Sequence, residues 1–257
     1  LPARYADRLR GRQAMNSPAE DPIDEAAHRV RARRSLTYLF MVAIVMFFAA
    51  LSSAYIVSRG SADYWVTFRM PVDFWYSTAI IVVSSLSVQL ALRAARHGDK
   101  RATATWLVAT LVLGVIFSVF QFKGWKEMSE RRMNLVTDKV TMTAGVYGVD
   151  FAITHKGVPL ERVDSLYYSQ DDPGHTAPLN ADMADHWNVS SGYFHVLTFS
   201  HWLHLAGGLV VLMVLTVRAL LGRYTAQAHT GVWQGTMYWH FLTGVWIYLL
   251  LFIAAVH

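Results

Sequence analysis

Three histidines inside two long apolar segments are the side chains with the clearest capacity for chemistry. His201 and His204 lie in one segment, and His240 lies in the other. Titratable side chains are costly in hydrocarbon, so their presence indicates buried partners or a functional site. His201 and His204 are three residues apart and therefore share a helical face, which Gly208 continues one turn further on.

One chemistry open to these histidines is haem ligation by one imidazole from each helix. At 1.5 Å per residue, His204 lies about 15 Å from one end of its helix, and His240 lies about 12 Å from the opposite end of the other, so their depths are similar. The alternative is that the histidines hydrogen-bond each other, an indole or a carbonyl, and so fix helix packing. Packing is favoured because bulky residues flank them, namely Trp202, Leu203, Trp239 and Phe241.

Further candidates adjoin these histidines. Trp239 and Trp246 flank His240 and are expected to pack within the membrane or at its interface. Arg218 and Arg223 follow the fourth apolar segment, where they can grip a lipid phosphate or simply snorkel and set the topology. The candidates for structural or lipid-cleft roles are therefore His201, His204, Gly208, Trp239, His240, Trp246, Arg218 and Arg223.

Other polar residues give weaker signals. A polar face suited to hydrogen bonds between helices is formed by Ser84, Ser85, Ser87 and Gln89. Metal-ligating residue types occur at Asp182, Asp185 and His186, but without a second cluster a solvated acidic loop is favoured. Cysteine is absent, which excludes disulfides, thiolate metal sites and Cys-x-x-Cys-His haem attachment. The apolar segments hold no nucleophile with a base, so we expect neither a catalytic centre nor a metal or cofactor in this chain.

The histidines must be positioned by membrane helices. Five segments are long enough to cross a bilayer, which takes about 20 apolar residues as a helix. None contains Asp, Glu, Lys or Arg, and they are Leu36–Val57, Phe74–Leu92, Ala102–Phe122, Phe194–Val217 and Val232–Val256. Hydrophobic residues make up 54% of the chain, which agrees with a membrane protein. The predicted fold is an all-α integral membrane five-helix bundle with an extramembrane insert between helices three and four.

The flanks of these segments predict the orientation. Arginines precede the first segment within residues 29–34, basic residues fill 93–101, and Arg218 and Arg223 follow the fourth segment. By the positive-inside rule these flanks are cytoplasmic, so we expect a bacterial inner-membrane protein with its N-terminus inside and its C-terminus outside. The net charge of +5 resides in such clusters, which fit anionic lipid headgroups better than nucleic acid.

Four regions follow from this pattern. They are a polar and basic tail (1–34), helices one to three (35–126), an extracytoplasmic insert (127–192) and helices four and five (193–257). The tail lacks the apolar core of a signal peptide, and Met15 within it is a candidate translation start. We assign it no function.

The insert is too long for an ordinary loop. Lys123–Tyr193 has seven Lys and Arg against ten Asp and Glu, so it lacks the basic excess of the cytoplasmic flanks. Val140–Thr154 is rich in β-branched and aromatic residues, and His155-Lys-Gly157 can turn into Val158–Tyr168, which predicts a hairpin. Asp171-Asp-Pro-Gly174 is a turn signal. Aromatic residues of the first outer loop resemble an interfacial belt, namely Tyr64, Trp65, Trp75 and Tyr76.

The segments together resemble a known family. Phe199-Ser-His201-Trp-Leu-His204-Leu-Ala-Gly207-Gly208, with Tyr238-Trp-His240-Phe and Val245-Trp246, resembles the last two helices of cytochrome c oxidase subunit III. Phe47-Phe-Ala-Ala-Leu-Ser-Ser-Ala-Tyr55 and Ser84-Ser-Leu-Ser-Val-Gln-Leu-Ala-Leu92 resemble the first two helices of its five-helix form. The resemblance covers about Leu36–Lys126 and Tyr193–Ala255, without the tail and the insert.

The resemblance implies a helical subunit without a redox centre, which lies beside haem–copper subunit I and subunit II. Haem and copper are then expected in those partners. Bound phospholipid is expected in a cleft of this chain, whose role would be to sustain proton uptake and stability. The insert lies outside the resemblance, and it could either bind an extracytoplasmic partner such as a further respiratory subunit or be a surface elaboration.

Two positions depart from the family pattern. A membrane-buried glutamate of many members is Ile44 here, and a common aspartate after Trp-His-Phe is Thr243, so roles resting on those carboxylates are in doubt. Two alternatives stay open: subunit III of a quinol oxidase, and a b-type cytochrome that uses His204 and His240. A small transporter is disfavoured because no broken helix or intramembrane carboxylate marks a substrate path.

Overall fold

A computed structural model of the chain describes residues 22–136, 138–226 and 229–256. Five of its helices are long and apolar enough to cross a membrane. They are α2 (Pro22–Ser61), α3 (Val72–Arg96), α4 (Lys100–Glu130), α6 (Val189–Leu220) and α7 (Thr230–Val256). The predicted all-α integral membrane bundle of five helices is therefore confirmed. The expectation about Met15 lies outside the described residues.

The chain divides within α2 into residues 1–40 and residues 41–257. In the first part, α2 begins at Pro22, so the end of the predicted tail is helical. The Thr37 hydroxyl donates to the carbonyl of Arg33 one turn earlier, at 2.9 Å. Such a bond satisfies a polar side chain within its own helix.

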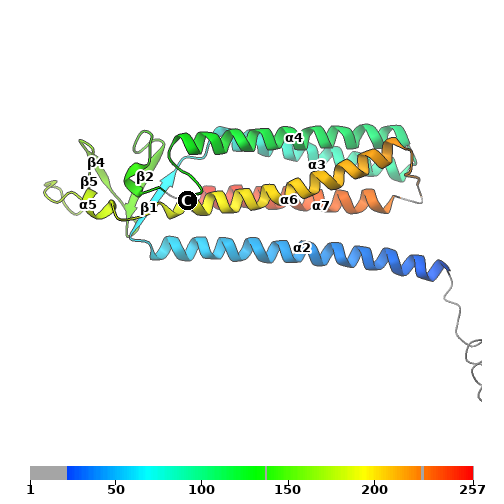
Figure 1. The fold of residues 1–257 in the computed structure, drawn as a ribbon, viewed down its shortest axis with the longest axis horizontal. Coiled ribbons are helices and arrows are strands. Elements are labelled where there is room, and N and C mark those ends of the chain that lie inside the picture. The colour runs from blue at the N-terminus through cyan, green and yellow to red at the C-terminus, as the bar shows by residue number, and fades with distance from the viewer. Residues whose placement is uncertain (1–21, 137, 227–228, 257) are drawn as a thin grey trace, which may run out of the picture. The chain divides into compact units, whose positions relative to one another are not determined.

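In the second part, α3 packs against α4 and α7, and α6 packs against the same two helices (Figure 1). Apolar residues along the facing sides fill the core, and they include Phe74, Ile81, Phe117, Leu205 and Leu242, none of which is exposed. The rest of α2 contributes a second apolar cluster with α6 and α7, which contains Ile44, Phe48, Tyr55, Leu197, Val245 and Leu249.

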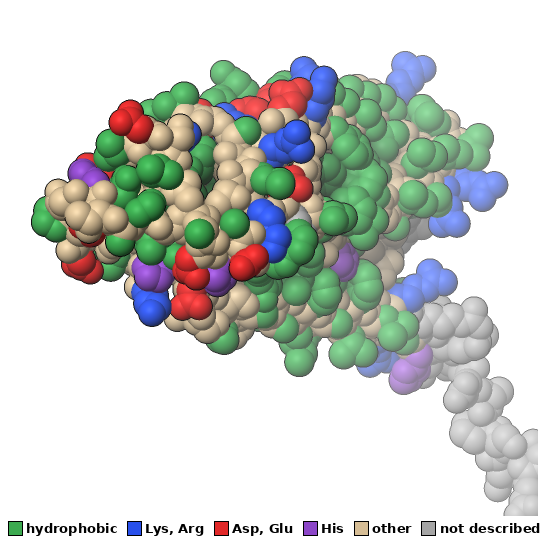
Figure 2. Space-filling model, turned by 60° about the vertical axis from the view of Figure 1, so that its left-hand side comes forward, with side chains coloured by type: hydrophobic (Ala, Val, Ile, Leu, Met, Phe, Trp, Pro, Cys, Tyr) green, Lys and Arg blue, Asp and Glu red, His purple; other side chains and the backbone are tan. Residues whose placement is uncertain are grey.

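The outward faces of these helices stay apolar. Leu86 on α3 and Val210 on α6 are 63% and 60% exposed, as hydrocarbon-facing side chains must be. Figure 2 shows the change of surface along the molecule: acidic and histidine side chains gather over the non-helical end, while hydrophobic side chains cover the adjoining helices. We call this end, β1 together with residues 131–188, the extramembrane lobe.

The lobe contains two small antiparallel sheets. In the first, β1 (Tyr64–Phe68) pairs with β2 (Phe151–His155), which pairs with β3 (Val158–Pro159). The strand β1 comes from the loop after α2, and its Val66 faces Ile153 in register. The prediction that Tyr64 and Trp65 form an interfacial belt is therefore wrong, because both side chains are buried in the sheet. Trp75 and Tyr76 are exposed, as a belt requires.

The predicted hairpin forms at its predicted turn, with shorter strands. Lys156 and Gly157 both have positive φ between β2 and β3, as a two-residue hairpin turn requires. The first arm is only Phe151–His155, since Val140–Met142 forms the 3₁₀ turn η1. The second arm is also short: Val158 and Pro159 pair with His155 and Thr154, and the Leu160 N–H donates to the Ile153 carbonyl at 2.9 Å. The chain continues into a separate hairpin of β4 (Glu161–Val163) and β5 (Leu166–Tyr168), followed by the short α5 (Asn180–Met183).

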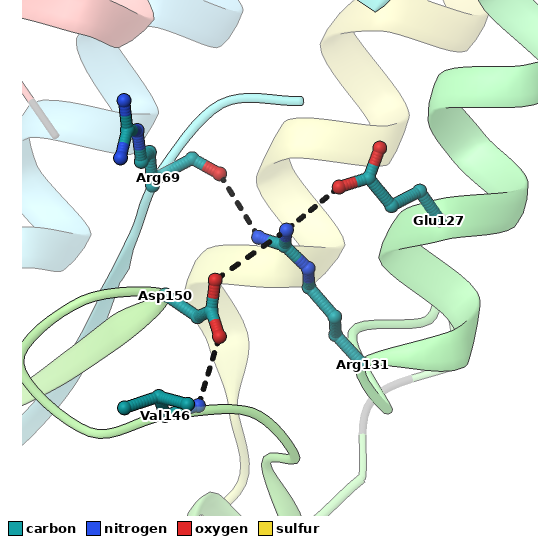
Figure 3. A network of polar contacts seen from close by, with 5 residues as sticks. All are labelled: Arg69, Glu127, Arg131, Val146 and Asp150. Carbon is teal, nitrogen blue, oxygen red and sulfur yellow. Dashed lines mark hydrogen bonds and ion pairs between the residues drawn. The ribbon is translucent and has the colours of Figure 1, made fainter. Parts of the chain in front are cut away.

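A polar network ties the lobe to the membrane helices (Figure 3). The Arg131 guanidinium at the end of α4 lies 2.6 Å from the Glu127 carboxylate and 3.5 Å from that of Asp150. It also donates to the carbonyl of Arg69, at 3.4 Å. Asp150 in turn accepts from the backbone N–H of Val146, at 2.9 Å. Three segments distant in sequence therefore meet at one arginine.

Candidate functional site at the interface of the membrane helices

Several polar side chains of α6 form hydrogen bonds to backbone carbonyls of their own helix. The Nδ1 atoms of His195 and His204 contact the carbonyls of Ser191 and Ser200, at 2.9 and 2.7 Å. A carbonyl only accepts, so these nitrogens carry the hydrogen. Thr198 donates similarly to Phe194, at 2.8 Å. Each bond removes the cost of an unpaired donor in hydrocarbon.

The two tryptophans of α7 donate hydrogen bonds to α3. Trp239 Nε1 donates to Ser84 Oγ at 3.0 Å, and Trp246 Nε1 donates to Thr78 Oγ1 at 2.9 Å. Both indoles are almost completely buried, so each bond fixes a large aromatic side chain against the neighbouring helix. The tryptophans therefore bind α7 to α3.

His240 lies between these two tryptophans in sequence and also faces α3. Its Nδ1 lies 2.5 Å from Ser85 Oγ, and its Nε2 lies 3.0 Å from Gln89 Oε1. Because the amide oxygen accepts only, Nε2 carries the hydrogen, and Nδ1 accepts from the serine hydroxyl. Both ring nitrogens are thus used in helix packing, and the polar face predicted on α3 does make hydrogen bonds between helices.

His201 has a different environment. Its side chain is fully buried, and its ring centroid lies 5.2 Å from that of Trp246 and 6.3 Å from that of Phe117. Phe48 of α2 lies on another side, at 6.4 Å. Neither ring nitrogen has a hydrogen-bond partner among the described residues. Among the described residues, His201 therefore packs against aromatic rings without a side-chain hydrogen bond.

The pair of His204 and His240 that their similar depths left open does not form between the described side chains. His204 faces α2, with its ring 5.6 Å from Phe48 and 6.1 Å from Phe47, whereas His240 points toward α3. The depth calculation fixes only the height of each residue, and the rotation of each helix about its axis separates the two rings. The α7 side chain that reaches His204 is Tyr238, whose hydroxyl donates to the His204 carbonyl at 3.2 Å.

Glycines let α7 approach its neighbours. A Cβ at Gly208 would lie 3.1 Å from a Leu242 methyl and 3.4 Å from the Trp239 ring, so α6 and α7 lie close together here. Gly114 of α4 provides even closer contact, because its Cβ would lie 2.9 Å from Trp239. Nothing in the sequence around Gly114 marks it as the residue that accommodates this indole.

Arg218 and Arg223 lie at the end of α6 and just beyond it, and both are exposed. The backbone N–H of Arg223 donates to the Arg218 carbonyl at 3.1 Å. Between α6 and α7, burial raises the pKa of the Tyr224 hydroxyl, although the nearby Arg218 guanidinium acts in the opposite direction. These arginines do not adjoin the buried histidines.

Both departures from the family pattern are buried and uncharged. Ile44 is 3% exposed and packs in the apolar cluster of α2, α6 and α7. Thr243 donates to the carbonyl of Trp239 one turn earlier, at 3.0 Å. Where many family members have carboxylates, this chain therefore has an apolar side chain in an apolar cluster at Ile44 and a hydroxyl bonded within its own helix at Thr243.

The metal-ligating residue types of the lobe have structural partners. Asp182 accepts from the Tyr64 hydroxyl at 2.6 Å, and its carbonyl lies 2.9 Å from His186 Nδ1. No group of three His, Asp or Glu side chains arranged for a metal ion occurs in the described ranges. Tyr64 thereby links the loop after α2 to the insert.

A groove between α2 and α7 is the feature that sequence reasoning missed. It has a volume of about 480 Å³ and an almost wholly apolar lining. Its lining residues are Val45, Phe48, Ala49, Phe241, Gly244, Val245 and Tyr248. None of the eight candidate residues lines it, since apolar residues in a membrane helix give no signal for a cavity.

The fold and these contacts define an integral membrane protein whose histidines and tryptophans join transmembrane helices. No family model matches the chain. It is 24% identical over 218 residues to "Probable cytochrome c oxidase subunit 3" of Nocardia farcinica, covering 82% of this chain and 81% of that protein. It is 25% identical over 223 residues to cytochrome c oxidase subunit 3 of Corynebacterium diphtheriae, covering 84% of each.

A similar match, 24% identical, is found to cytochrome c oxidase subunit 3 of the cyanobacterium Thermostichus vulcanus, over 82% of this chain and 81% of that protein. The resemblance inferred from the histidine motifs is confirmed: the chain is a relative of cytochrome c oxidase subunit 3.

Proposed function

We propose that this chain is the non-redox subunit III of a respiratory haem–copper oxidase, with cytochrome c as electron donor. The observation that carries the proposal is the hydrogen-bonded contact of α7 with α3. The histidine and tryptophans of the motif shared with subunit III direct their polar atoms to neighbouring helices. These bonds join helices within this chain, which supports a packing role for the motif residues and no redox role.

In this proposal the complex reduces oxygen to water and moves protons outward across a bacterial inner membrane. Subunits I and II supply the haem and copper, and this chain supports assembly, stability and lipid retention. The N-terminal tail (1–34) lies in the cytoplasm. The insert (127–192) and the C-terminus lie outside, where the insert is available to a further respiratory subunit.

The proposal is tested by purifying the affinity-tagged chain from its own membranes in a mild detergent. We expect a haem–copper subunit to co-purify and the reduced-minus-oxidised spectrum to show a-type haem. A partner with a copper-binding or c-haem domain would identify cytochrome c as the donor, and its absence would indicate a quinol oxidase. Recovery without any haem–copper subunit, or haem b bound to this chain alone, would overturn the proposal.

A further inference from the structure

The lobe presents two valines on an ordered turn. Val146 and Val149 are 60% and 59% exposed, and the Val149 N–H donates to the Val146 carbonyl at 3.1 Å. Tyr147 between them packs into the lobe, where its hydroxyl donates to the Leu160 carbonyl at 2.7 Å. The two glycines of this segment have φ of 127° and 81°, which glycine adopts readily. We call residues 145–149 the valine turn.

Two arginines border the valine turn. The Arg69 N–H donates to the carbonyl of Asp150 at 2.8 Å, and the Ala144 N–H donates at 3.0 Å to the carbonyl of Arg131, which precedes Arg132. Arg69 and Arg132 are exposed, and neither side chain forms a hydrogen bond or ion pair among the described residues. Figure 3 shows the Arg69 side chain turned away from Arg131. The carboxylate of Asp150 is already bonded to Arg131, so two uncompensated cations remain beside the exposed valines.

The valine turn lies beyond the lipid headgroups. The apolar segment of α4 ends at Phe122, and Arg131 follows nine residues later, about 13 Å further along the helix axis. The interfacial region on one side of a bilayer is about 5–8 Å thick. The turn therefore faces water, where exposed apolar side chains gain stability from contact with a protein rather than with lipid.

The free charges select the kind of protein. A second copy of this chain is disfavoured, because a two-fold contact brings the same cations together. A partner with carboxylates around an apolar contact complements both the valines and the arginines. Because the turn is already ordered in this chain, binding costs little conformational entropy here.

We propose that the valine turn, with Arg69 and Arg132 at its border, docks an extracytoplasmic protein whose contact face is apolar and edged by carboxylates. This inference deepens the proposed availability of the insert to a further respiratory subunit and rests on it. It assigns the contact to residues 145–149 and their two arginines, and not to the acidic remainder of the lobe.

The test is photocross-linking in native membranes, followed by purification of the affinity-tagged complex and sequencing of the cross-linked peptide. The photoreactive amino acid benzoylphenylalanine replaces Val146 in one variant and Gln170, an exposed residue elsewhere on the lobe, in the matched control. We expect Val146 to cross-link to one protein, in a peptide that carries apolar residues and carboxylates. The Gln170 position should give no such product.

Charge reversal then tests the arginines. Arg69→Glu together with Arg132→Glu should lower the yield of the Val146 cross-link about tenfold at low salt, because two attractive pairs become repulsive. Lys156→Glu, at an exposed cation on another turn, is the matched control and should keep the parent yield. Changing the carboxylates of the identified peptide to lysine should restore the cross-link to the doubly reversed variant.

Several outcomes would overturn the inference. They are a cross-link from Val146 to lipid, to a second copy of this chain or to a peptide without carboxylates, equal loss in Lys156→Glu, and no cross-link at all. Co-purification of a haem–copper subunit with each variant is measured in the same samples. If that subunit is retained and the Val146 cross-link is absent, the proposed function stands and the docking surface alone fails.

Discussion

The histidines of α6 and α7 differ in what their ring nitrogens do. His240 uses both nitrogens in bonds to α3, whereas His201 has no partner for either among the described residues. Removing one partner of a buried hydrogen bond leaves the other group unpaired. Removing a side chain that makes no such bond avoids that penalty. The two residues should therefore respond differently to the same substitution.

We predict that His240→Leu destabilises the protein by about 1–2 kcal/mol, because Ser85 and Gln89 lose their common partner. His201→Leu should leave stability within about 0.5 kcal/mol of the parent or raise it. Thermal unfolding of the two variants in the same detergent measures the difference. An equal loss in both would mean that His201 has a polar partner outside the described residues.

Much of this candidate site could be found from sequence, because titratable residues stand out in apolar segments. His201, His204 and His240 are identified in that way, and so is the polar face of α3. The bonding of each ring could not be predicted. It depends on which side chain of another helix lies opposite, and that is fixed only when the helices pack.

At the scale of elements, α4 and α7 meet where a glycine faces an indole. Gly114 leaves room for Trp239, whose ring also contacts the region of Gly208. A small residue is required here because helices in a membrane gain stability from close packing. The position of α7 thus depends on a residue of α4 that carries no side chain.

We predict that Gly114→Leu lowers stability by about 1–3 kcal/mol, the usual cost of overpacking. Its Cβ would lie 2.7 Å from a Leu209 methyl and 2.9 Å from Trp239, so α4 must move. Gly207→Leu is the matched control, because a Cβ there meets nothing within 4 Å. Thermal unfolding and retention of subunit I report the effect, and equal behaviour of the two variants would contradict it.

A pH-sensitive hydrogen bond joins β1 to α5 in the lobe. Tyr64 of β1 donates to Asp182 at 2.6 Å. Burial has the largest effect in raising the pKa of the Tyr64 hydroxyl. The hydrogen bond to Asp182 and then the charge of Asp182 raise this pKa further. A raised pKa in the folded state means that this stabilisation is complete below the ordinary tyrosine value of about 10. It is lost as the pH rises through the raised value.

We therefore predict that the tyrosinate absorbance of the parent minus that of Tyr64→Phe titrates above pH ~10. In Asp182→Asn the same difference should move down toward the ordinary value, because the carboxylate charge is gone. Loss of lobe structure at high pH, followed by near-ultraviolet circular dichroism, should be smaller in Tyr64→Phe. A Tyr64 titration at or below the ordinary value would refute the assignment.

The helices and strands differ in how far the sequence alone predicts them. The spans were predictable because membrane thickness sets a minimum length of apolar residues, and all five occur as helices. The strand β1 was not predictable, because its pairing with β2 joins residues more than eighty positions apart. The aromatic pattern of Tyr64 and Trp65 fits an interfacial belt and a buried strand equally well.

At the scale of the whole molecule, the arrangement of charge predicts the orientation. Basic residues of 93–101, Arg218 and Arg223 lie at one end of α3, α4 and α6, and the lobe with its acidic excess lies at the other. Basic flanking residues are retained on the cytoplasmic side during insertion. From this rule we expect the loop between α3 and α4 inside the cell and the lobe outside.

We predict that His97→Cys is labelled by an impermeant maleimide only after the membrane is opened, whereas Gln170→Cys is labelled in intact spheroplasts. Both positions are exposed, and the chain has no cysteine of its own to remove first. Parent protein, which should remain unlabelled, is the control. The opposite labelling pattern would reverse the proposed orientation.

The sequence by itself determines how many helices cross the membrane, which polar residues they carry and where the insert lies. These are local properties, because hydropathy and charge are read along a single segment. Only the tertiary structure decides that His240 turns to α3 and His204 to α2, that β1 joins the lobe, and that α2 and α7 enclose a groove. The reason is that a helix's rotation about its axis, and a strand's partner, are set by contacts with distant residues, which hydropathy along one segment does not record.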